Sequence, residues 1–397
     1  MLLSVNYSSS LRGGLAPVAR FVSVIVPAYN ASATIERTLR SIMVQTYAHL
    51  EIIVVDDGSN DHTAAIVERV GREDPRIILL RQPNEGVAAA RNLGVAHANG
   101  EFIAPIDADD IWHARKIEKQ IAVMEKGGDR IGLVYCYSRL IDEHDIVTPQ
   151  EGRQDKARGD VYALLILSNF VGNGSSPLIR RTYLQEVGGY DSSLRARGAQ
   201  GCEDWGVSLS IAERWEIDLV PEYLVGYRIA AGNMSRNHVT MARSWEIVIA
   251  DAQRGHPELP LKLIRWARGN FYRWLSSGCL GRGQIWWSLY YLAIALGYDP
   301  SETCSLRLVR DYLTRMVNPR IEGLRIARFV FRIRDLLWLR RPSSSILGMK
   351  YLEVDPKVND VVQVRPREIC RQSIARSLTV LFDTVLVEGP RSTKPKA

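Results

Sequence analysis

Three carboxylates follow a short apolar run near residue 105, and their spacing is suited to holding a cation. Residues 101–106 read Glu-Phe-Ile-Ala-Pro-Ile, and Asp107, Asp109 and Asp110 come directly after them. Like charges this close together repel one another unless a counter-charge neutralises them. Mg²⁺ and Mn²⁺ prefer hard oxygen ligands such as carboxylate and phosphate oxygens. The pattern therefore predicts a metal and phosphate site, with Mn²⁺ or Mg²⁺ at Asp109 and Asp107.

A second acidic pair, Asp56 and Asp57, ends the apolar run at residues 51–55. A carboxylate at such a strand end can accept hydrogen bonds from a base N–H and from ribose hydroxyls, which predicts nucleoside recognition. The alternative is that Asp57 or Ser59 forms a turn and Asp61 caps the next helix. Neither a G-x-G-x-x-G nor a P-loop pattern follows the first predicted strand, so no other nucleotide motif competes.

A third acidic pair, Glu203 and Asp204, opens a predicted amphipathic helix and precedes Trp205. A positioned carboxylate can act as a general base, which would let Asp204 take a proton from an acceptor hydroxyl. Acidic residues are also favoured in the first turn of any helix by the macrodipole, so a purely structural role is the alternative. The residues alone leave both interpretations open.

The elements that position these motifs alternate between strand and helix. Apolar runs predict strands at residues 21–29, 51–55, 76–80 and 101–106, and helical spacing appears at 34–44, from 63, and at 87–98. Such alternation predicts an α/β fold, Rossmann-like, with a mostly parallel sheet flanked by helices. In such sheets, ligands bind beyond the carboxyl ends of the strands, where the first two acidic pairs lie.

The pattern is looser after residue 115. We predict a helix to residue 124, strands at 131–137 and 175–179, a mobile loop at 192–201, and a strand pair within 217–229. From about residue 241 the pattern is helical throughout. The predicted organisation is a flexible tail (1–20), an α/β domain (21–240), a helical region (241–390) and a disordered end (391–397).

Composition narrows the setting of the protein. The net charge of +7 over 397 residues is modest, and no nucleic-acid partner is predicted. Five scattered cysteines without a C-x-x-C pair are typical of reduced thiols in a cytoplasmic protein. No signal-peptide pattern and no apolar run of about 20 residues is present, which predicts a soluble or peripheral protein. Arginines set among apolar and aromatic residues at 320–341 suit an anionic membrane surface, or else simply face water.

Five motifs in order resemble a known family, the family-2 inverting glycosyltransferases with the GT-A fold, over about residues 21–235. They are Val-Ile-Val-Pro-Ala-Tyr-Asn at 24–30, Val-Val-Asp-Asp-Gly-Ser at 54–59, Asn-Glu-Gly-Val-Ala-Ala-Ala-Arg-Asn at 84–92, Asp-Ala-Asp at 107–109 and Glu-Asp-Trp at 203–205. The resemblance implies transfer of a sugar, usually from a UDP-sugar, to an acceptor hydroxyl with inversion at the anomeric carbon. It implies a role in making cell-surface polysaccharide, lipopolysaccharide or glycolipid, at the cytoplasmic face of the membrane, on a saccharide or lipid-linked acceptor.

The resemblance also implies roles for matching residues. The residues that would contact the nucleotide are Pro27, Tyr29, Glu36, Asp56, Asp57, Gly86, Arg91 and Asp107. Asp109 and Asp107 would bind the metal, and Asp204 would be the catalytic base, assisted by Glu203. Trp205 and Glu203 would contact the acceptor. One departure stands out, because Ala230 occupies the place where many relatives have a histidine near the metal, and His238 lies off register. Arg228, Asn233 or water is then expected to stand in for that histidine.

Two other functions compete with this interpretation. A non-catalytic nucleotide-sugar-binding or scaffolding protein would keep the fold, and Ala230 is the one feature that favours it. A nucleotidyltransferase would share the nucleotide and metal sites, but it would carry a glycine-rich, lysine-containing loop after the first strand, and residues 30–34 offer none. The three intact acidic motifs favour the transferase.

Overall fold

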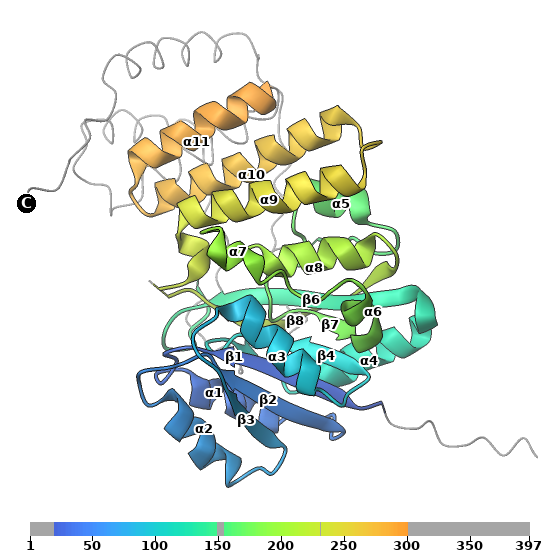
Figure 1. Ribbon diagram of the computed structural model, residues 1–397, viewed down its shortest axis with the longest axis vertical. Coiled ribbons are helices and arrows are strands. Elements are labelled where there is room, and N and C mark those ends of the chain that lie inside the picture. Colours follow the sequence, from blue (N-terminus) through green and yellow to red (C-terminus); the bar gives the residue numbers. More distant parts are fainter. Residues whose placement is uncertain (1–19, 149–154, 231, 301–397) are drawn as a thin grey trace, which may run out of the picture.

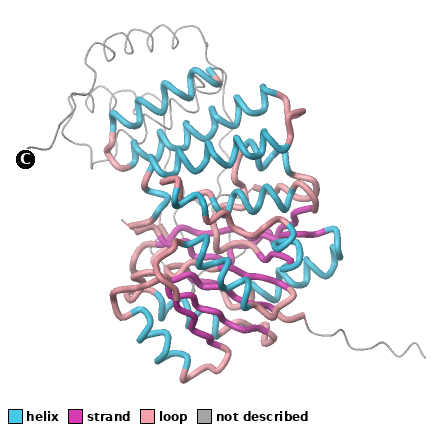
Figure 2. Tube along the Cα trace, viewed as in Figure 1, coloured by secondary structure: helices cyan, strands magenta, loops and turns pink. Residues whose placement is uncertain are grey.

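The computed structural model describes residues 20–148, 155–230 and 232–300, which form one mixed sheet with helices on both faces and a helical layer beyond (Figures 1 and 2). The sheet has eight strands in the order β3-β2-β1-β4-β7-β6-β8-β5. Its long pairings are parallel and its antiparallel pairings are short, and the α/β class predicted from the sequence is confirmed.

The first half of the chain has the predicted strand–helix alternation. Its elements are β1 (Val22–Ala28), α1 (Ile35–Met43), β2 (Leu50–Asp56), α2 (Thr63–Gly71), β3 (Ile77–Arg81), α3 (Val87–His97) and β4 (Phe102–Pro105). β1 pairs in parallel with both β2 and β4, and every residue of these three strands is buried. Continuous apolar runs of this kind are what a sheet covered on both faces requires. The β2 and β4 carboxyl ends therefore flank the end of β1.

The second half of the chain completes the sheet. It contains β5 (Ile111–Trp112), α4 (Lys116–Gly127), the short 3₁₀ helix η1 (Gly128–Arg130), β6 (Ile131–Ile141), α5 (Tyr162–Leu167), β7 (Leu178–Arg180), α6 (Arg181–Glu186), α7 (Ser193–Ala196), α8 (Glu203–Ala212) and β8 (Glu216–Arg228). Strand β7 runs antiparallel to both β4 and β6, and so joins the two parallel parts of the sheet. The predicted loop at 192–201 contains the helical turn α7.

The strand pair predicted within residues 217–229 is wrong, because this segment is the single strand β8. Pro221 and Glu222 interrupt the apolar pattern, but both lie within the strand. β8 pairs in parallel with β6, and the register shifts on either side of Tyr137 accommodate the interruption. On its other edge β8 pairs with β5, which follows the acidic triplet directly.

Three long helices pack beyond α8, which separates them from the sheet (Figure 1). They are α9 (His238–Gly255), preceded by the 3₁₀ turn η2 (Met234–Arg236), α10 (Leu261–Gly281) and α11 (Ile285–Tyr298). The Trp245 and Phe271 rings stack with centroids 4.4 Å apart, and Trp205 of α8 packs against both. One apolar cluster thus runs from the sheet into these helices.

The helical pattern predicted after residue 241 is present as far as residue 300. The domain boundary at residue 240 stays a prediction. The predictions for residues 320–341 and 391–397, and for nearly all of 1–20, lie outside the described residues. Within the described ranges, no helix has the length and apolar character that crossing a bilayer demands.

Candidate functional site

A buried arginine joins two of the three acidic motifs at the carboxyl edge of the sheet. Arg91, in the second turn of α3, donates from Nη2 to Asp107 Oδ1 at 2.6 Å and from Nη1 to Glu203 Oε1 at 3.1 Å. Its side chain is only 2% exposed, and its guanidinium lies 5.2 Å from the centre of the Tyr190 ring. A buried arginine is stable only when its charge is matched, so Arg91 and the two carboxylates form one unit. The segments after β4 and at the start of α8 are therefore held together.

Asp204 lies in the first turn of α8, next to this unit. Its Oδ1 accepts a hydrogen bond from the backbone N–H of Trp205 at 2.7 Å. Burial, the largest cause, and the charge of Glu203 together raise the pKa of its carboxyl to about 7, against the opposing effect of the Arg91 guanidinium. A carboxyl with a pKa near neutrality can exchange a proton at physiological pH, which is what a general base must do.

The two neighbours of Asp204 are both held in place. Glu203 is 5% exposed, and its Oε2 accepts from the Gly201 N–H at 3.0 Å while Oε1 faces Arg91. Trp205 is 7% exposed, and its Nε1 donates to the Leu165 carbonyl at 2.9 Å. Stacking of an acceptor sugar on Trp205 would require the ring to leave this buried position. The acceptor contacts of Trp205 and Glu203 stay predictions, and the observed geometry gives both a supporting role beside Asp204.

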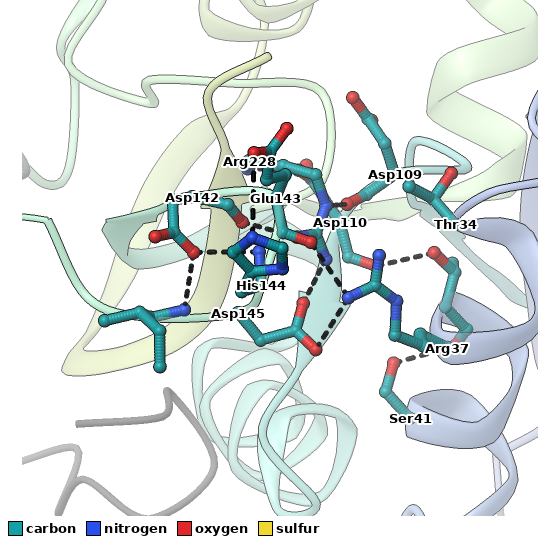
Figure 3. Close-up of polar contacts among 12 residues, drawn as sticks. Thr34, Arg37, Ser41, Asp109, Asp110, Asp142, Glu143, His144, Asp145 and Arg228 are labelled. Atoms are coloured by element: carbon teal, nitrogen blue, oxygen red, sulfur yellow. Dashed lines mark hydrogen bonds and ion pairs between the residues drawn. The ribbon is translucent and has the colours of Figure 1, made fainter. Parts of the chain in front are cut away.

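The acidic triplet after β4 divides into one inward and two outward carboxylates. Asp110 is completely buried, where its Oδ2 accepts from Ser175 Oγ at 2.5 Å and its Oδ1 from the Arg228 N–H at 2.9 Å. Burial raises the pKa of Asp110 well above its ordinary value. Burial and the charge of Asp107 raise the pKa of Asp109 to about 6. In Figure 3 the Asp109 side chain points away from Asp145 and Arg37.

The outward pair fits a divalent cation that also binds substrate. Asp107 uses Oδ1 for Arg91, while Asp109 carries a charge that its surroundings make costly and that a cation would stabilise. Within residues 20–148, 155–230 and 232–300 no group of three or more histidine, cysteine or acidic side chains is arranged to hold a metal. Mg²⁺ and Mn²⁺ commonly take one or two carboxylates and complete their shell with phosphate oxygens and water. The chemistry of the two carboxylates therefore fits such an ion.

Comparisons with known proteins identify the family. Residues 23–188 match the family model described as Glycosyl transferase family 2. An uncharacterized glycosyltransferase of Nostoc sp. is 30% identical over 241 residues, which cover 59% of this chain and 71% of that protein. The chain belongs to glycosyl transferase family 2.

Two further proteins add detail to this family assignment. A glucosyltransferase of Escherichia coli, named UDP-Glc:alpha-D-GlcNAc-diphosphoundecaprenol beta-1,3-glucosyltransferase, is 42% identical over 127 residues, covering 32% of this chain and 49% of its own. A Pyrobaculum calidifontis mannosyltransferase, solved with GDP-Man and Mn²⁺, superposes with a TM-score of 0.51 at 21% identity, covering 81% of this chain and 88% of that one. This likeness confirms the predicted GT-A fold. The chain spans about half the length of some relatives, such as 54% of a Rickettsia prowazekii glycosyltransferase.

Ala230 stands where many relatives have a histidine, and the histidine nearest to it in the sequence, His238, has a packing role. His238, at the start of α9, is 7% exposed, and its Nδ1 lies 3.0 Å from the Tyr291 hydroxyl of α11. Burial lowers its pKa. The Asn233 side chain accepts from the Ala230 N–H at 3.0 Å and donates to the Arg228 carbonyl at 2.6 Å, so it holds the turn after β8. In this geometry, therefore, neither the His238 nor the Asn233 side chain takes the place of the histidine that Ala230 replaces.

Of the nucleotide-binding predictions, the second acidic motif is the most constrained. Asp57 accepts three hydrogen bonds, from Gln82 Nε2 at 2.7 Å and from the backbone N–H groups of Glu85 and Gly86, each at 2.8 Å. It thereby shapes the loop before α3. Gly86 has φ +93°, a backbone conformation that residues with a side chain rarely adopt, so glycine is favoured there. Base recognition by Asp57 stays a prediction.

The remaining predicted contacts lie around the ends of β1 and β2. Asp56 Oδ1 accepts from the Ser59 N–H at 3.1 Å, Pro27 is buried within β1, and Tyr29 follows that strand with 49% of its surface exposed. Glu36 lies on α1 in surface ion pairs with Arg69 at 2.5 Å and with Arg40 at 3.3 Å. The structure brings Asp107, Asp109, Arg91, Glu203 and Asp204 together, whereas Glu36 is occupied elsewhere.

Two site residues escaped the sequence analysis. Ser175 lies 65 positions after Asp110, donates to its carboxylate, and accepts from the Asp107 N–H at 2.9 Å. Thr38 of α1 donates to the carbonyls of Ala108 at 2.9 Å and Asp110 at 2.8 Å. Single hydroxyl residues in apolar surroundings have no distinctive spacing, so only the folded chain reveals that they fix the acidic turn.

Proposed function

We propose that this family-2 member transfers a sugar from a nucleotide-sugar donor to an acceptor hydroxyl, with inversion at the anomeric carbon. The observation that carries the proposal is the Asp204 carboxyl, whose pKa is raised to about 7 and which adjoins the Glu203–Arg91–Asp107 unit. A carboxyl of this kind supports the proposal, because it could accept a proton close to the carboxylates that would hold the metal of a diphosphate. Alignment of two reactants in this way is a major source of rate enhancement.

Asp204 supplies the base in a single displacement. The acceptor hydroxyl gives its proton to Asp204 as its oxygen forms a bond to the anomeric carbon. The bond from that carbon to the diphosphate oxygen breaks on the opposite face, and the nucleoside diphosphate leaves with the bonding electrons. One displacement inverts the configuration and needs no covalent enzyme intermediate. Arg91 holds the first turn of α8, in which Asp204 lies, through Glu203 Oε1, and Glu203 Oε2 accepts from the Gly201 N–H just before the helix.

Asp109 and Asp107 would hold the Mn²⁺ or Mg²⁺. Such an ion neutralises the charge that develops on a departing diphosphate. The chain's own contribution is to keep the two carboxylates in place, through Ser175, Thr38 and the buried Asp110. A rigid acidic turn spares the reaction the cost of assembling the ligands at the moment of transfer.

The substrates belong to the proposal as classes. The name of the Escherichia coli relative includes UDP-Glc and a diphosphoundecaprenol-linked sugar, which supports a UDP-sugar donor and a saccharide or lipid-linked acceptor. Synthesis of cell-surface polysaccharide, lipopolysaccharide or glycolipid at the cytoplasmic face of the membrane follows from such an acceptor. The proposed peripheral membrane contact through residues 320–341 lies outside the described residues.

The first experiment measures thermal stabilisation by UDP, GDP and CMP, each with and without Mn²⁺. A ligand that binds only the folded state raises the melting temperature with its occupancy. We expect a manganese-dependent shift with UDP and slow release of UDP from a UDP-sugar. Binding without any release from a panel of UDP-sugars, with or without acceptors, would instead support the non-catalytic nucleotide-sugar-binding protein. A failure of every nucleotide to bind would overturn the proposal.

A further inference from the structure

The turn that follows β6 is built around two aspartates. Asp142 Oδ1 accepts from the backbone N–H groups of His144 at 2.8 Å and Ile146 at 2.9 Å, which closes the turn. Asp145 has φ +68°, in the left-handed region that aspartate and asparagine tolerate better than most residues. The backbone thus presents the Asp145 side chain toward the end of β8 (Figure 3).

Asp145 links two arginines from distant parts of the chain. Its Oδ2 lies 3.1 Å from Arg37 Nη1 on α1, and its Oδ1 forms an ion pair with Arg228 Nη2 at the end of β8. The Asp145 side chain is 22% exposed and that of Arg228 is 2% exposed. Because Arg228 is almost fully buried, its charge requires a fixed counter-charge.

Arg228 carries this link to the acidic turn. Its Nε donates to the Asp109 carbonyl at 2.6 Å, and its backbone N–H donates to Asp110 Oδ1 at 2.9 Å. Its Nη1 donates to the Asp142 carbonyl at 2.5 Å, so each guanidinium nitrogen has a partner. A planar guanidinium bound at three corners has one orientation. The position of the Asp109 backbone therefore depends on where Asp145 and Asp142 hold Arg228.

We propose that Asp145 is a positioning residue for the Asp107/Asp109 metal and diphosphate site. It acts through Arg228 and touches neither substrate nor metal, and the inference rests on the function proposed above. Partners that orient metal ligands commonly change metal affinity about 10- to 100-fold when they are removed. In a site without the family's usual histidine, where Ala230 stands, the orientation of Asp109 becomes more important.

The test compares Asp145→Asn with Glu222→Gln. Asparagine keeps the left-handed turn while removing the charge, so the backbone is not strained. Glu222 is a matched control, because its side chain is 15% exposed and its ion pair with Lys119, at 2.5 Å, joins α4 to β8 away from the acidic turn. The readout is the affinity for Mn²⁺ in the presence of UDP, measured by the electron paramagnetic resonance signal of free Mn²⁺, beside the melting temperature of each variant.

We expect Asp145→Asn to weaken Mn²⁺ binding about tenfold or more, and Glu222→Gln to leave it unchanged at a similar loss of melting temperature. The variant should also raise the donor KM more than it lowers kcat, because ligand placement governs donor binding. If Asp145→Asn does not fold, Arg37→Met is the second variant, because it keeps the ion pair between Asp145 and Arg228. We expect Arg37→Met to weaken Mn²⁺ binding in the same way but to a smaller degree. Unchanged Mn²⁺ affinity in the folded variant would overturn the inference, whereas failure of the unmodified protein to bind Mn²⁺ with UDP, GDP or CMP would overturn the proposed function instead.

Discussion

The Arg91 guanidinium lies 3.1 Å from the Glu203 carboxylate, although 112 positions separate the two residues in the sequence. The same guanidinium binds Asp107, so one cation connects the carboxylates that follow β4 with the first turn of α8. This contact ties the acidic turn that we propose for the donor diphosphate to the helix turn that carries Asp204, the proposed base. Loss of Arg91 should therefore disturb stability and catalysis together.

Replacement of Arg91 by methionine would leave Asp107 and Glu203 without their shared counter-charge. Removing one partner of a buried ion pair typically costs about 3–5 kcal/mol, so we expect a loss of unfolding free energy of that order. Since the arginine lowers the pKa of Asp204, the pH midpoint of transfer should also move upward. Denaturant unfolding and a pH–rate profile measure the two effects. Arg91→Lys keeps the charge, so a midpoint that moves equally in both variants would contradict this account.

Asp204→Asn tests the base directly. The amide is nearly the same size, and it can still accept the hydrogen bond from the Trp205 N–H. It cannot take a proton, and loss of a general base typically lowers the rate about 10²–10⁴-fold. We expect donor affinity, measured by calorimetry, to remain close to that of the unmodified protein. Undiminished turnover would remove Asp204 from the role of base.

Strand β1 and its neighbours could be predicted from the sequence because parallel strands buried on both faces are continuous apolar runs. Strand β8 could not, because Pro221 and Glu222 interrupt its pattern and its pairing with β6 is irregular near Tyr137. The strand's true length depends on its pairing with β6, about 85 residues earlier in the sequence, which local periodicity does not record.

The sequence singled out the outward-facing carboxylates of the candidate site but not the residues that hold them in place. Asp107, Asp109 and Asp204 fall at strand and helix ends, where chemistry in this fold is placed. Ser175 and Asp145 support them from other segments, and their hydrogen bonds exist only once the chain has folded. The motif of Trp205 suggested an acceptor contact, which stays a prediction, and only the fold shows that its indole is buried beside Trp245.

The pH dependence of transfer should follow the ionisation of Asp204. Burial raises the pKa of its carboxyl to about 7, so the base is mostly protonated below that pH and mostly ionised above it. Initial rates at saturating substrate and Mn²⁺ should therefore rise as the pH increases through about 7 and then level off. Any turnover that remains in the Asp204→Asn variant should lack this rise. A flat profile between pH 5.5 and 8.5 in the unmodified protein would contradict the assignment.

Asp109→Ala should weaken the metal-dependent part of donor binding. This substitution removes one of the two outward carboxylates but leaves the Asp109 carbonyl, to which Arg228 donates, in place. We expect the stabilisation of the protein by UDP in the presence of Mn²⁺ to fall to the level seen with UDP alone. Thermal unfolding with and without Mn²⁺ measures this difference. Equal activity of the unmodified protein with Mn²⁺ and with a chelator would contradict the metal's role.

Lys116 offers a test of stability away from the chemistry. This lysine of α4 is fully buried, donates to Gln120 Oε1 at 2.8 Å and lies 4.0 Å from the centre of the Trp112 ring. Burial lowers its pKa to about 8 from an ordinary value of 10.5, an effect that a small contribution from Cys136 opposes. The unfolded state therefore binds more protons than the folded state between these two pH values, and stability must rise with pH across that window.

The gain in unfolding free energy that follows deprotonation of Lys116 in the folded state should be absent at low pH and present at high pH. Between about pH 8 and 10.5 the unmodified protein should gain roughly 3 kcal/mol of unfolding free energy relative to Lys116→Met. Lys116→Met also leaves Gln120 Oε1 without its donor, but this lowers the unfolding free energy equally at every pH. The slope of unfolding free energy against pH is therefore unaffected by it. Lys126→Met, at the exposed end of the same helix, is the control and should follow the unmodified protein. Parallel curves for the unmodified protein and Lys116→Met from pH 7 to 10 would show that Lys116 keeps an ordinary pKa in the fold.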